Sequence, residues 1–164
     1  MNSTSILRFT KAYRDFLAGD ATLVSLVSYN ATTNISIIFD SGEQTINPPM
    51  LIMELGSTHP WMSDVDNFYE TIIHHYAYTT KRLTSLQIIS ALYGKVKQSS
   101  SQADASFSSN NIVSRSLMPL EVPDRPGEAT MLPDSIRRTE RSDAPIADRH
   151  VARLLTLCRW TDTA

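Results

Sequence analysis

A long alternating segment followed directly by an amphipathic one constrains the fold of this chain more than any other sequence feature. Over Phe68–Tyr78, residues 68, 72, 76 and 78 would share one face of an extended strand, and residues 69, 71, 73, 75 and 77 would share the other. Thr79 or Thr80 can then cap a helix over Lys81–Lys97. The predicted apolar stripe of that helix is Leu83, Leu86, Ile89 (or Ser90), Tyr93 and Val96. The helix is therefore expected to pack on a sheet that contains this strand.

Two N-terminal helices and further strands are predicted on either side of this unit. The helices cover residues 3–17 and 21–27, the second capped by Asp20, and the strands cover residues 35–39, 50–55, 112–122 and 150–161. The run Met50–Leu55 is almost wholly apolar, which is typical of a strand covered on both faces. The predicted fold class is α+β: a mainly antiparallel β-sheet packed against a long amphipathic helix, with one or two N-terminal helices. A length of 164 residues is that of a single domain.

Three segments lack periodicity. Residues 56–66, which contain His59, Pro60 and Trp61, are predicted to form a loop. Residues 98–111 are predicted to be a low-complexity polar linker that adds nothing to a core. From about 123 to 148 the chain forms a Pro/Arg-rich arm, and irregular excursions of this length in a small domain are usually functional or disordered.

Composition and charge argue against several classes of protein. The net charge of −2 gives the whole chain no bias towards nucleic acid or an anionic membrane. Cys158 is the only cysteine, which rules out an intrachain disulfide, and its apolar neighbours predict a buried thiol. The sequence shows no secretory signal, and no apolar stretch approaches the ~20 residues that span a bilayer. We therefore expect the protein to mature in the cytoplasm.

Two groups of residues suggest a metal site, but neither meets the geometric or spacing requirements of such a site. His74 and His75 are neighbours in a predicted strand and would point to opposite faces, so they cannot chelate one ion together. Asp64 and Asp66, with Glu70, resemble the start of a calcium loop, but the glycine and glutamate required at its sixth and twelfth positions are missing. We predict no metal and no cofactor, and an exposed acidic loop at Asp64 and Asp66.

No catalytic motif is present in the sequence. The five glycines are scattered, so no glycine-rich phosphate loop can form, and GxSxG, HExxH and CxxC are all missing. An enzyme would need a constellation of distant residues, such as His59, Asp64, Asp66 and His150. A small metal-dependent hydrolase built from these residues is the alternative from a different class, and we predict no catalytic residue.

Trp61 has two interpretations. It is an aromatic residue in a polar segment, and that segment could simply fold back over the edge of the sheet. Tryptophan is also enriched at the hot spots of protein interfaces, so Trp61 is a candidate subunit-interface residue.

The order of these elements resembles the tail terminator (tail completion) proteins of tailed bacteriophages. The resemblance rests on four segments and covers roughly two-thirds of the chain. They are residues 16–27 (FLAGDATLVSLV), 48–55 (PPMLIMEL), 67–96 (a long strand leading into an amphipathic helix) and 148–157 (DRHVARLLTL). The long arm at 123–148 departs from the family pattern, as does the loop after Ser28.

This resemblance implies a non-enzymatic structural protein of the virion. Such a protein caps the completed tail tube, commonly as a homohexameric ring, and joins it to the head-side connector. The implied partners are other copies of the chain, the tail tube protein and the connector or stopper protein, with DNA at most passing through the ring, and the implied location is the head–tail interface of the virion. A tail-tube or connector subunit is the neighbouring alternative, and a host-directed binding module is a third.

The arm supplies the other candidate interface residues. Arginine makes bidentate, planar contacts better than lysine does, and an irregular arm can become ordered on a neighbouring subunit. We expect Arg125, Arg137, Arg138 and Arg141 to contact adjacent subunits.

Overall fold

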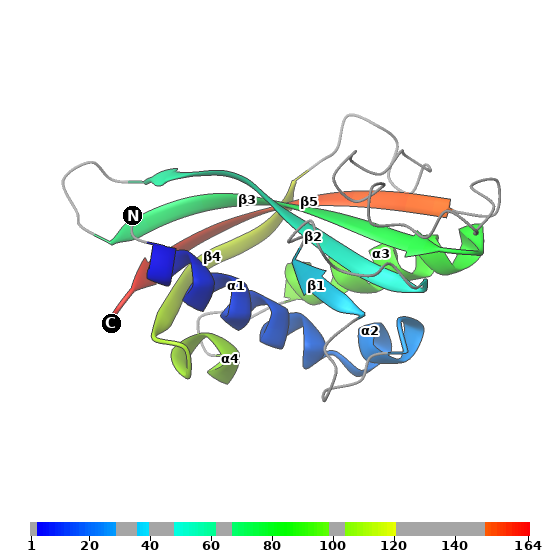
Figure 1. The fold of residues 1–164 in the computed structure, drawn as a ribbon, viewed down its shortest axis with the longest axis horizontal. Coiled ribbons are helices and arrows are strands. Elements are labelled where there is room, and N and C mark those ends of the chain that lie inside the picture. The colour runs from blue at the N-terminus through cyan, green and yellow to red at the C-terminus, as the bar shows by residue number, and fades with distance from the viewer. Residues whose placement is uncertain (1–2, 29–35, 40–47, 62–66, 99–103, 121–149) are drawn as a thin grey trace.

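The chain is built around a five-stranded sheet with the strand order β1-β2-β3-β5-β4 (Figure 1). The computed structural model describes residues 3–28, 36–39, 48–61, 67–98, 104–120 and 150–164. The strands are β1 (Ile37–Phe39), β2 (Met50–Pro60), β3 (Phe68–Thr79), β4 (Ile112–Leu120) and β5 (His150–Asp162). The helices are α1 (Ser3–Ala18), α2 (Ala21–Leu26), α3 (Arg82–Gln98) and α4 (Ala105–Ser108). This arrangement confirms the predicted α+β class.

The long strand predicted from the alternating pattern is the centre of the sheet. β3 pairs antiparallel with β2 on one side and with β5 on the other, where the register runs from Phe68 opposite Thr161 to Thr79 opposite His150. β4 is antiparallel to β5, whereas the short β1 is parallel to β2. The sheet is therefore mainly antiparallel, as expected, with β1 and β4 at its edges.

Helices cover one face of the sheet, which we call the inner face. α1 and α3 lie beneath the strands in Figure 1 and share one hydrophobic core with alternate residues of β3 and β5. The central contact is between Phe9 of α1 and Trp160 of β5, whose rings stack with centroids 4.5 Å apart. Both side chains are fully buried.

α1 is also fixed to the end of β5 by polar contacts. Ser5 and Arg8 both donate hydrogen bonds to the buried carboxylate of Asp162. Burial alone would raise the pKa of Asp162, but the hydrogen bonds from Ser5, the Ala164 backbone and Arg8 outweigh it and lower that pKa. The interaction couples the first helix to the last strand.

The two N-terminal helices match the prediction closely. α1 runs one residue beyond the predicted end, and its buried side chains include Phe9, Tyr13, Phe16 and Leu17. The carboxylate of Asp20 caps α2 by accepting a hydrogen bond from the Leu23 N–H at 2.8 Å.

The predicted apolar stripe of α3 is confirmed at Leu86, Ile89 and Val96 and is wrong at Leu83 and Tyr93. Its buried side chains are Ser85, Ile88, Ile89, Leu92 and Val96. Leu83 and Tyr93, assigned to the stripe from the sequence, are 67% and 43% exposed. Apolar residues occur nearly all round this helix, so two overlapping stripes satisfy helical spacing and only packing against the sheet selects one.

The predicted loop at 56–66 is also corrected. β2 continues through residues 56–60, and its register with β3 shifts between Leu55 and Thr58. Gly56 lies in this irregularity, where a Cβ atom would come within 2.9 Å of His74 Nε2. Glycine and proline therefore mark a bulge and a strand end here, not a loop.

Part of the predicted polar linker contributes to the core. Within residues 98–111, Asp104 caps α4 by accepting a hydrogen bond from the Ser106 N–H at 2.8 Å. Phe107 of α4 is 1% exposed and packs against Phe16, with ring centroids 5.3 Å apart. One aromatic residue inside a serine-rich stretch is enough to bring α4 onto α1.

Candidate interaction surface

We call the face of the sheet turned away from the helices the outer face. The burial of its side chains changes along β2. Near the start of β2 a second hydrophobic cluster is buried on this face, formed by Met50, Ile52, Tyr76, Tyr78 and Val151. Met50–Met53 are thus buried on both faces, as the apolar run predicted. Towards the other end of β2 the side chains become more exposed, and this is where Trp61 lies.

Trp61 directly follows the last residue of β2 and lies beside the start of β3. Its N–H donates a hydrogen bond to the carbonyl of Phe68 at 3.1 Å. Its ring is tilted against the Phe68 ring with centroids 5.0 Å apart, and the Arg159 guanidinium lies 4.4 Å from its centroid. The side chain is nevertheless 40% exposed. Trp61 is therefore held in place without being buried.

A carboxylate fixes the arginine that holds Trp61. Arg159 Nε donates to Glu70 Oε2 at 2.8 Å, and His59 Nε2 lies 3.2 Å from Glu70 Oε1. The register of the sheet explains this arrangement, because Glu70 lies between His59 on β2 and Arg159 on β5. Ion pairs this close to the surface add little to stability, but they restrict side-chain rotamers.

Arg115 of β4 extends the same group of residues across the sheet. Its guanidinium lies 5.7 Å from the centroid of the Phe68 ring. We define the aromatic–arginine cluster as Trp61, Phe68, Glu70, Arg115 and Arg159. It combines two aromatic rings with two guanidinium groups, and Trp and Arg are among the residues most enriched at interface hot spots.

Apolar side chains continue from the cluster along the outer face. Ile72 is paired with Leu157, which is paired in turn with Met118. Met118 is 39% exposed, and the other two are partly buried. An apolar strip bordered by charged groups is the usual anatomy of a protein interface.

The inner face instead contains a fully buried hydrogen-bond network. His75 Nδ1 donates to the Leu154 carbonyl at 3.1 Å, and His75 Nε2 accepts from the Tyr13 hydroxyl at 2.9 Å. The Tyr13 oxygen in turn lies 3.0 Å from Thr156 Oγ1. Burial lowers the pKa of His75 to about 3, so the imidazole is neutral. Every polar atom in this network has a partner, which indicates a structural role.

Within the described part of the chain, the structure does not bring together the histidines that were weighed from the sequence for a metal site or an active site. His74 lies opposite Glu54 on the outer face while His75 is buried on the inner face, so the predicted divergence of the pair is confirmed. His59 and His150 lie opposite Glu70 and Thr79, separated by nine residues of β3, or about 30 Å. Within the described ranges no group of three or more His, Cys, Asp or Glu side chains could hold a metal. Asp64 and Asp66 lie outside these ranges.

Cys158 is buried on the inner face, as predicted. Burial raises the pKa of its thiol to about 12, and Ser114 Oγ lies 3.9 Å from the sulfur. A protonated, enclosed thiol is a poor nucleophile.

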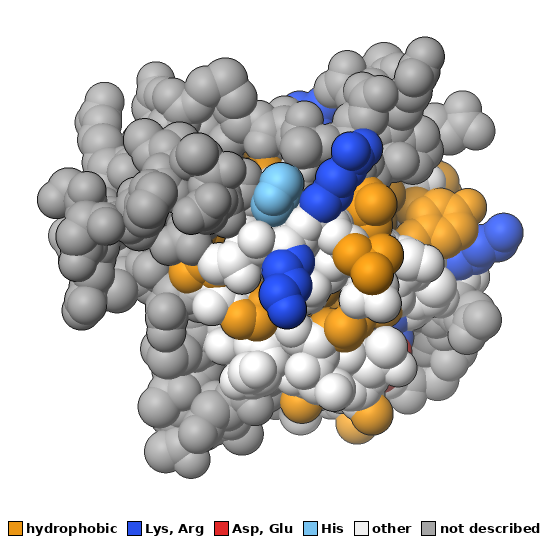
Figure 2. Space-filling view, turned by 90° about the vertical axis from the view of Figure 1, so that its right-hand side faces the viewer, with side chains coloured by type: hydrophobic (Ala, Val, Ile, Leu, Met, Phe, Trp, Pro, Cys, Tyr) orange, Lys and Arg blue, Asp and Glu red, His pale blue; other side chains and the backbone are white. Residues whose placement is uncertain are grey.

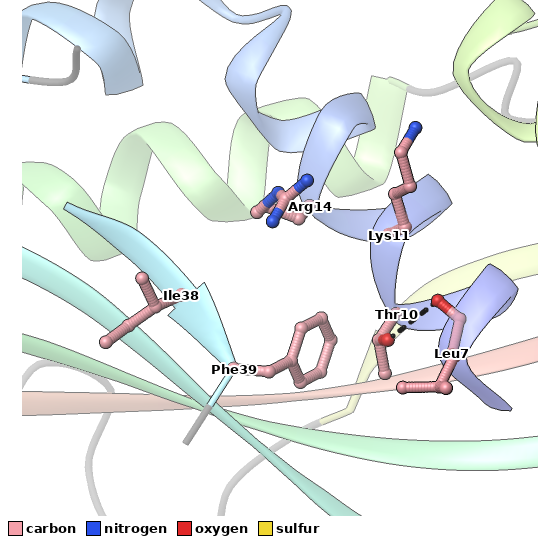
Figure 3. A pocket seen from close by; sticks show the side chains of 6 residues that line it. All are labelled: Leu7, Thr10, Lys11, Arg14, Ile38 and Phe39. Atoms are coloured by element: carbon pink, nitrogen blue, oxygen red, sulfur yellow. Dashed lines mark hydrogen bonds between the residues drawn. The ribbon is translucent and has the colours of Figure 1, made fainter. Parts of the chain in front are cut away.

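A shallow hollow of about 320 Å³ lies between α1 and β1 (Figure 3). It is lined by Leu7, Thr10, Lys11, Arg14, Ile38 and Phe39. Lys11 bonds to Asp15 and Asn110, and the Thr10 hydroxyl donates to the Leu7 carbonyl. The lining contains no histidine or carboxylate that could activate the Thr10 hydroxyl or the Lys11 amine, so we assign it no catalytic role.

The arm predicted at about 123–148, with Arg125, Arg137, Arg138 and Arg141, lies outside the described residues. Among the helices that are described, none is both long and apolar enough to cross a membrane.

A scan against protein-family models and a search of curated proteins found no match to this chain.

Proposed function

We propose that this protein is a structural assembly subunit of the tail-terminator type, which caps a phage tail tube as a closed ring and presents a surface to the head-side connector. The observation that carries the proposal is the aromatic–arginine cluster. Trp61 remains 40% exposed although Arg159 and Phe68 fix its position. A rigid, partly exposed tryptophan loses little conformational entropy on binding, so it suits a permanent contact.

The different roles of the inner and outer faces of the sheet also support an assembly role. The helices and the inner face form a complete core, so neither Trp61 nor Arg159 is needed to close it. A ring of identical subunits requires two different surfaces that fit each other, one on each neighbour. The aromatic–arginine cluster is one such surface in this proposal.

The arm at about 123–148 is proposed as a second contact with the neighbouring subunit. Arg125, Arg137, Arg138 and Arg141 would pair with carboxylates of that subunit. Replacing residues 123–148 by a short Gly/Ser linker should leave a folded chain that no longer assembles, because β4 and β5 are adjacent strands that a shorter connection can join. Unchanged assembly of that variant would remove the arm from the proposal.

The decisive experiment is the solution mass measured by light scattering over a range of concentrations, with and without purified tail tubes. A closed species of about six copies, alone or only on tubes, is expected. Trp61→Ala should abolish it, whereas Leu7→Ala, which truncates an exposed residue of α1, should not. A chain that stays monomeric with and without tubes would contradict the proposal.

Electron microscopy of the same samples separates a terminator from a tube or connector subunit. A terminator should decorate one end of a tube and stop its growth. A tube subunit should stack into open polymers, because its contacts do not close.

A further inference from the structure

Positive charge is concentrated on α3, although the chain as a whole is slightly acidic. The net charge is −2, yet no Asp or Glu occurs between Glu70 and Asp104, and α3 lies within that stretch. Figure 2 shows the end of the molecule where β3 leads into α3, with hydrophobic and Lys or Arg side chains in view and almost no Asp or Glu. The charge of the whole chain therefore does not describe this helix.

The exposed residues of α3 form one continuous face. An α-helix turns by about 100° per residue, so positions 82, 83, 87, 90, 93 and 97 fall within an arc of about 140°. We call this group the α3 face, and its members are Arg82, Leu83, Gln87, Ser90, Tyr93 and Lys97. Lys81, which is also exposed, directly precedes it. The face thus has cations at both ends and an uncharged middle.

The cations of the α3 face have no acidic partner in the described part of the chain. Four cations on other elements each pair with a carboxylate: Arg8, Lys11, Arg14 and Arg159. No carboxylate among the described residues lies within ion-pair distance of Lys81, Arg82 or Lys97. The Lys97 amine instead lies 5.6 Å from the centroid of the Tyr93 ring, which keeps it on the face. Such a set of cations attracts a ligand with several negative charges.

The spacing of the cations indicates which polyanion fits. Arg82 and Lys97 are fifteen residues apart, or about 22 Å along the helix. The major groove of B-form DNA is about 12 Å wide and admits an α-helix. A helix of this length in the groove has its two ends beside the two sugar–phosphate backbones. Phosphates are the groups that Lys and Arg neutralise when a protein binds DNA.

The uncharged middle of the face carries groups suited to base edges. The Gln87 amide and the Ser90 hydroxyl can form hydrogen bonds with bases, and Leu83 can contact a thymine methyl group. Leu83 is 67% exposed, which its packing within the chain does not explain.

Gly94 is a second residue of α3 that internal packing does not require. It lies between Ser90 and Lys97 on the same side of the helix, where glycine lowers helix propensity. Among the described residues, a Cβ atom at this position would meet no atom within 4 Å outside the adjacent helix backbone. The missing side chain leaves room for another molecule to approach the helix backbone closely.

We infer that the α3 face binds double-stranded DNA in its major groove. Lys81 and Arg82 contact one phosphate backbone, Lys97 contacts the other, and the uncharged middle lies against the base edges. The inference does not depend on the proposed assembly function, because the aromatic–arginine cluster lies on the outer face of the sheet and α3 covers the inner face. An acidic protein surface is the competing occupant, but two separate groups of cations fit two rows of phosphates better than one acidic patch.

The salt dependence of DNA binding tests the inference. Binding of the full chain to a labelled 20-base-pair duplex of mixed sequence is measured by fluorescence anisotropy at 50–200 mM salt. Three phosphate contacts predict a slope of log K against log salt of about −3, or roughly a fortyfold loss of affinity over this range. Lys97→Ala should reduce the slope by about 1, and Lys81→Ala/Arg82→Ala by about 2. Lys11→Ala, which truncates an exposed lysine of α1, is the matched control and should leave the slope unchanged.

Two further measurements separate groove binding from charge attraction and from altered stability. Gly94→Leu should raise the Tm, because leucine favours a helix, and yet weaken DNA binding by filling the space beside the helix backbone. A duplex RNA of the same sequence should bind more weakly than the DNA, because its deep, narrow major groove does not admit the helix.

Each outcome decides the inference. DNA binding that weakens in the α3 variants but not in Lys11→Ala supports it. No binding at 50 mM salt, unchanged affinity in the α3 variants, or equal binding of duplex RNA would overturn it. Tighter binding to poly-L-glutamate than to DNA would overturn it in favour of an acidic protein surface. A chain that binds DNA in this way but never self-associates in light scattering supports this inference and contradicts only the assembly function.

Discussion

The two tryptophans of this chain lie on opposite faces of one sheet and differ in almost every physical respect. Trp160 is fully buried on the inner face, stacked on Phe9 and donating from its indole nitrogen to Thr71 Oγ1 at 2.9 Å. Trp61 is 40% exposed at the outer-face end of β2, held by Arg159 and Phe68. One ring is fixed by burial and the other by a charged neighbour.

The difference shows that Trp160 stabilises the fold, whereas Trp61 belongs to the surface that a partner can contact. Removing water from Trp160 contributes directly to stability, because its whole surface leaves solvent. Trp61 keeps much of its surface in contact with water, and that surface can be buried only when a partner binds. The two faces can therefore be tested independently, and the substitutions below compare them.

The largest effect is expected from Trp160→Ala. Truncating a fully buried tryptophan should lower the free energy of unfolding by about 3–5 kcal/mol, measured by urea denaturation. Trp61→Ala should change it by less than about 1 kcal/mol while reducing self-association. Equal losses of stability at the two positions would contradict the division between the faces.

Acid should destabilise the inner face through His75. Its pKa is about 3 in the folded chain, below the ordinary value of 6.5, so the unfolded chain binds the extra proton first as the pH falls. The free energy of unfolding should therefore decrease from about pH 6.5 downwards, by about 1.4 kcal/mol for each pH unit until the pH nears 3. Urea denaturation across this range should give a flatter profile for His75→Gln, even though that variant is less stable at neutral pH. Parallel profiles would show that His75 is not the group responsible.

Tyr13→Phe should have an intermediate effect. Removing one hydroxyl leaves His75 Nε2 and the Thr156 hydroxyl without their shared partner in a buried site, which should cost about 1–3 kcal/mol. Tyr93→Phe makes the same chemical change on the exposed face of α3 and should stay within about 0.5 kcal/mol. Thermal unfolding of the two variants side by side is the direct comparison.

The smallest effect on stability is expected from Glu70→Gln. Its carboxylate pairs with Arg159 close to the surface, so its loss should cost less than about 1 kcal/mol. Arg159 would then no longer be fixed over Trp61, and self-association measured by light scattering should weaken. A variant that assembles like the wild type would show that Trp61 needs no fixed position.

The sequence predicted those elements in which several signals agree. Alternation over residues 68–78 identified the central strand, and the Asp20 cap located α2. The interpretation of α3 failed at Leu83 and Tyr93 because periodicity cannot choose between two apolar stripes on the same helix. β2 was ended too early because Gly56 and Pro60 normally interrupt strands, and only pairing with β3 reveals the bulge that accommodates them.

The candidate surface was predictable only in part. Trp61 was identified from its residue type, but Arg159 is brought over its ring by strand register, 98 residues away in the sequence. Register also places Glu70 against Arg159 and Arg115 against Phe68. Nothing in the spacing of these residues signals that they meet. The exposure of Leu83 and Tyr93 depended on which stripe of α3 faced the core.

The adjacency of β4 and β5 has a consequence for how this protein can change over time. Residues 121–149 join two strands that are hydrogen-bonded neighbours, and Leu120 at the end of β4 lies opposite Leu155, five residues into β5. Loop-closure entropy grows only logarithmically with length, and doubling such a connection costs about 0.6 kcal/mol. The chain can therefore gain or lose residues here while its folding equilibrium hardly changes. Natural selection on the length of this segment would then depend on the partners that it binds and not on the stability of the sheet.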